Sequence, residues 1–141
     1  MIRFGGPLFG VDMTDPDAVA AACKQAGYGA IYCPDLNPDD EKGCRDYGRA
    51  IARHGLMIAE AGVWIRLAGP NAEETRANVE RAIRRLRVAD LTGAQCCVDI
   101  AGSFHPTAWH GAHPDNVTDE MADAAVVIAR TIIDTVEPRH A

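Results

Sequence analysis

The feature of this sequence that most limits its fold is a pattern that occurs four times. Each time, a short apolar segment is followed by a loop rich in Pro, Gly and Asp, and then by a longer segment with apolar residues at helical spacing. The apolar segments predict strands at residues 2–5, 30–33, 57–63 and 95–100. Consecutive βα units join through right-handed crossovers, so the pattern predicts an α/β fold whose parallel strands follow chain order.

Capping signals bound the four predicted helices. A polar cap followed by Pro is typical of a helix start, and Gly is typical of the residue after a helix end. The starting signals are Thr14 or Asp15 with Pro16, Asn37 with Pro38, the loop 69–71, and Thr118. The ending signals are Gly27, Gly55, Gly93 and the pair Glu137–Pro138.

Two architectures fit such a parallel sheet, an open doubly wound sheet and a piece of a closed (β/α)8 barrel. The first βα turn lacks the GxGxxG and GxxxxGK[ST] phosphate-binding patterns that a nucleotide-binding open sheet often carries there. Glu60 and Asp99 fall near the ends of predicted strands, where carboxylates are typical of the mouth of an enzymatic barrel. We therefore expect a parallel (βα)4 half of a TIM (β/α)8 barrel.

Composition places the chain among ordinary soluble proteins. It has 141 residues, of which 48% are hydrophobic and 24% charged, so we expect one domain over residues 1–141. No apolar run approaches the roughly 20 residues that a membrane-spanning helix needs, and the start lacks the order of a signal peptide. We predict a cytoplasmic protein with no membrane partner.

The formal charge of −6 argues against nucleic acid as a partner. The local basic group alternates with glutamates on a predicted helix, where Glu80 precedes Arg84 by four residues, so we interpret it as a solvated face with ion pairs. The group consists of Arg76, Arg81, Arg84, Arg85 and Arg87. The five cysteines show no CxxC spacing, and we expect no disulfide framework.

Four segments together resemble a known family. They are Gly5-Gly6-Pro7-Leu8, Gly27 to Tyr32, Ile58-Ala59-Glu60-Ala61-Gly62-Val63-Trp64, and Val98-Asp99-Ile100-Ala101-Gly102-Ser103. In this order they resemble the sugar-phosphate isomerase/epimerase family, the xylose-isomerase-like TIM barrels, which also include the endonuclease IV type of DNA repair enzyme. The resemblance covers essentially the whole chain but only the first four of the family's eight units, as if the chain were truncated.

The resemblance implies a divalent metal, manganese or a similar ion, held by carboxylates and a His at the later strands. There, two acidic residues move a proton next to the carbonyl of a ketose or keto-polyol. Those later strands lie outside this sequence, so no metal ligand and no catalytic residue is carried over. We expect the chain to be inactive by itself.

The residues present offer a candidate substrate-binding site. The long loop after the fourth predicted strand holds three histidines and a tryptophan, and in a barrel it would overhang the mouth. Tryptophans would supply apolar walls, and polar side chains would bind hydroxyls or a phosphate. The predicted substrate-binding residues are Glu60, Trp64, Asp99, Ser103, His105, Trp109 and His110. The alternative is that Trp109 anchors the loop and that the histidines are solvated.

No metal site is assigned to this chain. His105, His110 and His113 have spacings of five and three, which match no recognised ligand pattern. Cys96 and Cys97 are neighbours on a predicted strand, so they point to opposite faces and cannot share an ion. Asp35 fits the catalytic end of a strand and an ordinary turn equally well.

We therefore predict an isomerase or epimerase for a small sugar, sugar phosphate or keto-polyol, of which this chain is the N-terminal half. The alternative is a non-catalytic βα domain that binds a small molecule or completes a barrel with another chain. Open strand edges would then favour a homo-oligomer. An endonuclease-type phosphodiesterase is disfavoured by the acidic charge.

Overall fold

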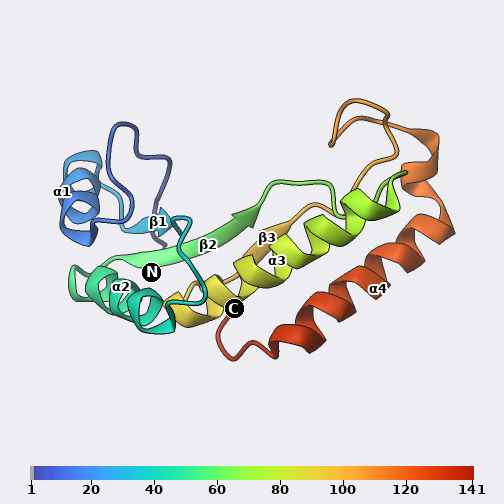
Figure 1. The fold of residues 1–141 in the computed structure, drawn as a ribbon. Coiled ribbons are helices and arrows are strands. Elements are labelled where there is room, and N and C mark those ends of the chain that lie inside the picture. The colour runs from blue at the N-terminus through green and yellow to red at the C-terminus, as the bar shows by residue number, and fades with distance from the viewer. Residues whose placement is uncertain (1) are drawn as a thin grey trace. The chain divides into compact units, whose positions relative to one another are not determined.

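The computed structural model describes residues 2–141 and contains a three-stranded parallel sheet with four α-helices (Figure 1). The α-helices are α1 (Pro16–Ala26), α2 (Glu41–Arg53), α3 (Ala72–Thr92) and α4 (Asp119–Val136). The strands are β1 (Ala30–Tyr32), β2 (Met57–Val63) and β3 (Cys97–Asp99). A short 3-10 helix, η1 (Pro114–Val117), lies between β3 and α4.

The strands follow chain order, β1-β2-β3, as the sequence predicted. The predicted first strand at residues 2–5 is wrong as a full strand, because it is reduced to one parallel bridge between Gly5 and Ala30. Gly5 approaches β1 so closely that an added Cβ would lie 2.4 Å from the carbonyl oxygen of Ala30. The backbone there can pair only where no side chain stands, which keeps the pairing short.

The chain divides into two compact units. Of the described residues, the first unit contains 2–62, 85–97 and 138–141, and the second contains 63–84 and 98–137. Both units therefore contain part of the sheet and part of α3.

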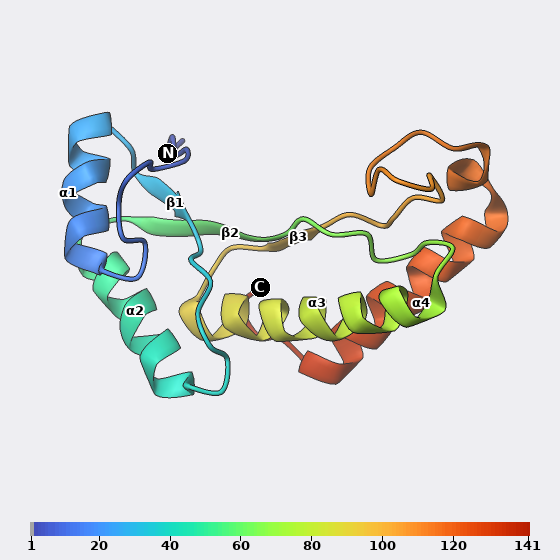
Figure 2. The ribbon, with the colours of Figure 1, turned by 45° about the horizontal axis from the view of Figure 1, so that its top comes forward.

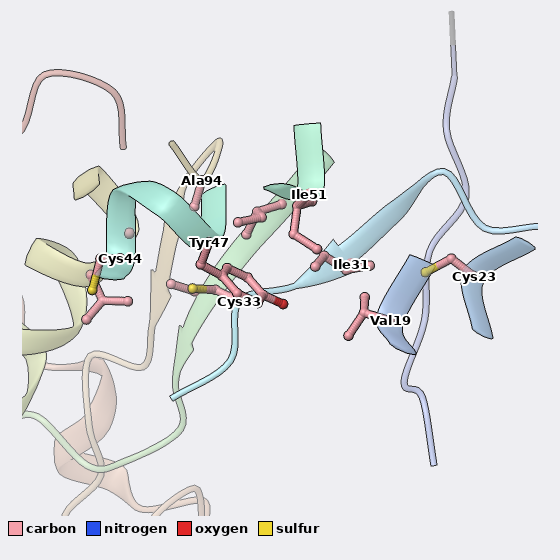
Figure 3. Close-up of a cluster of buried hydrophobic side chains, with 12 residues drawn as sticks. Val19, Cys23, Ile31, Cys33, Cys44, Tyr47, Ile51 and Ala94 are labelled. Atoms are coloured by element: carbon pink, nitrogen blue, oxygen red, sulfur yellow. The ribbon is translucent and has the colours of Figure 1, made fainter. Parts of the chain in front are cut away.

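In the first unit, one cluster of buried apolar side chains contains residues from strands β1 and β2 and from helices α1, α2 and α3 (Figure 3). Ile31 of β1 and Cys33, which directly follows this strand, belong to the cluster, so the helices pack on the face that these alternate residues share. Helices α1 and α2 lie next to each other in both ribbon views (Figure 2). The other cluster members are Val19, Cys23, Cys44, Tyr47, Ile51, Ile58, Ala61, Val88, Ala89 and Ala94.

A β-bulge in β2 decides which way Glu60 points. Ile31 is paired with Ile58, but the next residue, Tyr32, is paired with Glu60, so β2 has one extra residue. Glu60 consequently shares the face of Tyr32, opposite to Ile31 and the helices. Tyr32 is 46% exposed on this face, which we call the Tyr32 face.

The second unit continues from the end of β2 and from β3. The amide of Ala68 donates to the carbonyl of Ala101 at 2.8 Å, and Ala68 also bridges to Gly102. Helix α4 buries Met121 and Ile132. Among residues 2–141, none of the helices has the length and apolar character needed to cross a membrane.

Most predicted helix ends are confirmed. Asp15 caps α1 through its side chain, and Gly27 follows it in the left-handed conformation. The predicted start of α2 is wrong, because the helix begins at Glu41 with Asp40 as its cap. Asn37 instead accepts the amide of Asp39 in a preceding turn, a local bond that competes with helix formation.

Candidate functional site

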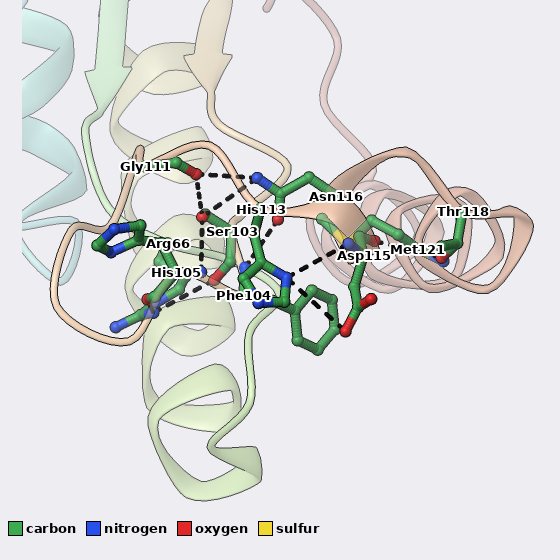
Figure 4. A network of polar contacts seen from close by, with 10 residues as sticks. All are labelled: Arg66, Ser103, Phe104, His105, Gly111, His113, Asp115, Asn116, Thr118 and Met121. Carbon is green, nitrogen blue, oxygen red and sulfur yellow. Dashed lines mark hydrogen bonds and ion pairs between the residues drawn. The ribbon is translucent and has the colours of Figure 1, made fainter.

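The loop after β3 carries most of the predicted site residues and is ordered by a polar network around Ser103 (Figure 4). Ser103 is 1% exposed, and its hydroxyl donates to the carbonyl of Gly111 at 2.6 Å. Asn116 donates to the same carbonyl at 2.9 Å, and its Oδ1 accepts the amide of Phe104 at 2.8 Å. These hydrogen bonds join distant residues of the loop to one another. The hydroxyl of Ser103 is therefore used within the loop and not for a ligand.

The side chain of His105 also forms hydrogen bonds within this loop. Its Nδ1 accepts the backbone amides of Thr107 and Ala108 at 3.3 and 3.0 Å. A ring nitrogen that accepts must be unprotonated, so the neutral ring carries its proton on Nε2. Of the two ring nitrogens of His105, Nδ1 is therefore already occupied by backbone amides.

Trp109 and His110 lie at the turn of this loop. Their rings meet edge to face with a centroid separation of 4.7 Å. His110 is exposed and Trp109 is half-buried. An exposed imidazole beside an indole can contact a polar ligand and an apolar sugar face, although this stays a prediction.

Arg66 is a member of this network that the sequence did not single out. Its guanidinium donates to the carbonyls of Ser103 and His105 at 3.2 and 2.8 Å and lies 3.4 Å from the carboxylate of Glu74. The side chain is only 11% exposed, and its buried Nε has no acceptor in the described chain. Asn78 holds the carbonyl of Arg66 itself at 2.7 Å. An isolated Arg after a strand carries no sequence signal for such a role.

The two predicted carboxylates fall in different units. Glu60 belongs to the first unit and is half-buried on the Tyr32 face, whereas Asp99 ends β3 in the second. Partial desolvation raises the pKa of the Asp99 carboxyl although its side chain is largely exposed. Trp64 directly follows β2 and is 57% exposed. The prediction that Glu60, Asp99 and Trp64 share one pocket stays a prediction.

Two cavities lie in the first unit, of about 510 and 460 Å³. Met57, at the start of β2, lines both of them, and Arg3 lines the larger one. None of the seven predicted site residues lines either cavity.

The solvated arginine face predicted on α3 is wrong for Arg85. Its guanidinium donates to the carbonyls of Cys33, Pro34 and Gly62 at 2.5, 2.6 and 3.2 Å. These carbonyls follow β1 and lie at the end of β2, so Arg85 holds the strand ends from which loops leave. The sequence contains only a weak signal for this role of Arg85, because the other arginines of the same segment are exposed.

Comparison with known proteins gives no relative. No family model, no curated protein and no solved structure matches this chain. What the site does must therefore be argued from its own residues.

Among residues 2–141, no three His, Cys, Asp or Glu side chains converge. The described part of the chain therefore shows no group of ligands for the divalent metal that the family resemblance implies. Cys97 packs against the apolar cluster and Cys96 is exposed, in agreement with their predicted opposite faces.

Proposed function

We propose that this chain is a sector of a β/α barrel and contributes to the isomerisation or epimerisation of a small sugar, sugar phosphate or keto-polyol. The supporting observation is the bulge that turns Glu60 onto the Tyr32 face while the helices of its unit pack on the opposite face. A barrel keeps its helices outside and binds substrate at the C-terminal ends of its strands.

The chemistry of the two carboxyl groups suits this proposal. An ionised Glu60 can accept hydrogen bonds from two adjacent hydroxyls of a sugar. Asp99, whose pKa is raised by desolvation, holds a proton at a higher pH than an ordinary aspartate does. A carboxyl group that exchanges its proton closer to neutral pH is better suited to general acid and base catalysis. The divalent metal stays an expectation from the family resemblance.

Ligand titration by NMR tests this proposal. In 15N-labelled protein, a ketose and its phosphate should shift the amide of Glu60 in a saturable way. Glu60→Gln keeps the size of the side chain but removes its charge, and we expect it to weaken binding at least about tenfold, as the loss of a charged hydrogen bond of roughly 1.5–3 kcal/mol implies. Glu73→Gln, an exposed position in α3, is the matched control. Absent shifts, or equal shifts in Glu60→Gln, would refute the proposal.

The alternative is a non-catalytic domain that binds a second chain. Exposed apolar side chains of the first unit favour it, namely Ile2 at 84%, Phe4 at 75% and Tyr32 at 46% exposure. Sedimentation equilibrium should then show a dimer that Phe4→Ser dissociates, with no response to the ketoses. A monomer at all concentrations would exclude this alternative.

A further inference from the structure

We propose that His105 is an acid-sensitive latch that closes the loop 103–111 while its ring is neutral and releases it when the ring is protonated. This goes beyond the proposed function and holds whether or not the loop contacts a sugar. It rests on the two backbone amides, those of Thr107 and Ala108, that Nδ1 of His105 accepts.

The direction of these two bonds makes the latch sensitive to acid. Both amides point their hydrogens at one ring nitrogen, and only a lone pair on that nitrogen can accept them. Protonation converts Nδ1 from an acceptor into a donor, so two N–H groups would then face a third. Histidine is the side chain whose ordinary titration falls between pH 5 and 8.

The latch is coupled to the closure of the loop through Gly111. A Cβ at Gly111 would lie 2.4 Å from Cγ of His105, so the ring packs directly against the backbone at this glycine. The carbonyl of Gly111 is the acceptor shared by Ser103 and Asn116. The amide of His105 donates to the Ser103 hydroxyl at 3.0 Å. A ring that swings away from Thr107 and Ala108 therefore disturbs the contact that holds both ends of the loop.

The charged neighbours of His105 come from two other segments. Arg66, after β2, donates to the carbonyl of His105, and Glu74 of α3 lies behind Arg66 at 3.4 Å. Within the same loop, Nδ1 of His113 lies 3.7 Å from the carboxylate of Asp115 and accepts the Asp115 amide. The bond that reports on the His113 ring is therefore made by the amide of Asp115 and not by those of Thr107 and Ala108.

The segment that this latch controls carries Trp109 and His110. Residues 106–110 lie between His105 and Gly111, and the two hydrogen bonds to Nδ1 of His105 are donated by amides within this stretch. Release would free the indole and the exposed imidazole to move while Ser103 stays buried at the base of the loop.

NMR on the intact chain tests the latch. Long-range 15N spectra should show His105 with its proton on Nε2 at pH 7.5. As the pH falls, the heteronuclear NOE of the Thr107 and Ala108 amides should drop with the same midpoint as the His105 ring. Finding the proton on Nδ1 at pH 7.5, or unchanged order of both amides through the titration of His105, would overturn the proposal.

Variants separate His105 from its neighbours. Asn at position 105 offers an acceptor that does not titrate, so His105→Asn should abolish the acid transition of both amides. His110→Asn and His113→Asn are matched controls and should keep it. Gly111→Ala should displace the ring and lower both NOE values already at pH 7.5. The same transition surviving in His105→Asn would contradict the latch.

Discussion

At the scale of single residues, Arg85 shows how one side chain can hold several strand ends together. Its three donors satisfy the carbonyls of Cys33, Pro34 and Gly62, which come from two segments of the first unit. Cys33 and Pro34 are buried, so water would not replace the guanidinium freely. The residue therefore stabilises the sheet at the end from which the loops toward Asp35 and Trp64 depart.

Removing this guanidinium should destabilise the protein. We expect Arg85→Ala to lower the free energy of unfolding by about 2–3 kcal/mol, because buried carbonyls lose charged donors. Urea denaturation measures the loss, and Arg76→Ala, an exposed position on the same helix, serves as control. A cost no larger than that of the control would show that the three bonds are not stabilising.

Residue chemistry also explains which site predictions could be made from the sequence. Glu60 and Asp99 stand out because carboxylates are rare inside parallel strands, and both do lie in strands of the sheet. The role of Ser103 could not be predicted, because it depends on Gly111 and Asn116 returning to it through the loop. Arg66 and Arg85 were missed for the same reason, since their acceptors are backbone carbonyls distant in sequence.

At the scale of secondary structure elements, glycines set how closely two helices approach. Gly48 of α2 lies against the end of α3, where an added Cβ would come within 2.2 Å of the carbonyl oxygen of Thr92. Gly48→Ala should gain helix propensity of about 1 kcal/mol yet destabilise the fold, because backbone cannot yield as a flexible side chain can. Thermal unfolding should show a lower midpoint for Gly48→Ala, and a raised midpoint would contradict the close approach.

Ion pairs on α2 predict how stability responds to acid. Hydrogen bonds from Arg87 and Arg45 hold the pKa of Glu41 below its ordinary value, and bonds from Lys42 and Arg49 do the same for Asp46. A carboxylate whose pKa is lower in the folded state stabilises the protein above its unfolded pKa. That contribution is lost as the pH falls through the folded value.

We therefore expect stability to decline as the pH falls below about 4, near the ordinary carboxyl values. Glu41→Gln should flatten this decline, because it removes one of the titrating groups that link α2 to Arg87 of α3. Urea midpoints between pH 3 and 7 measure the effect, with Glu120→Gln in α4 as control. Equal slopes for both variants would mean that the Arg87 contact adds nothing.

The elements themselves were largely predictable, and the exceptions have local causes. β2 was predicted over its full length because its apolar run is long and bounded by turn residues. β3 is shorter than predicted, since it spans only Cys97–Asp99. The bulge at Glu60 could not be predicted, because it depends on the register with Tyr32 of another strand.

At the scale of the whole molecule, the sequential order β1-β2-β3 and the packing of three helices on one face of the first unit are compatible with a partial βα repeat fold. An open doubly wound sheet would place helices on both faces. The proposal of a barrel therefore rests on the arrangement within one unit, and the isomerase or epimerase activity stays a proposal.

The last prediction concerns the activity of the isolated 141-residue chain. Moving a proton at a sugar carbon requires two opposed carboxyl groups around a fixed substrate, and Glu60 and Asp99 lie on neighbouring strands of one sheet. The loop histidines offer little preorganisation for an ion, since Nδ1 of His105 and of His113 already accept backbone amides. We expect no ketose epimerisation above a metal-only blank, and only weak binding of manganese or zinc in calorimetric titrations.

Stoichiometric submicromolar binding that is lost in a His105→Ala, His110→Ala double variant would contradict the weak-binding prediction. Turnover above the blank would show that these 141 residues already contain a complete acid and base pair.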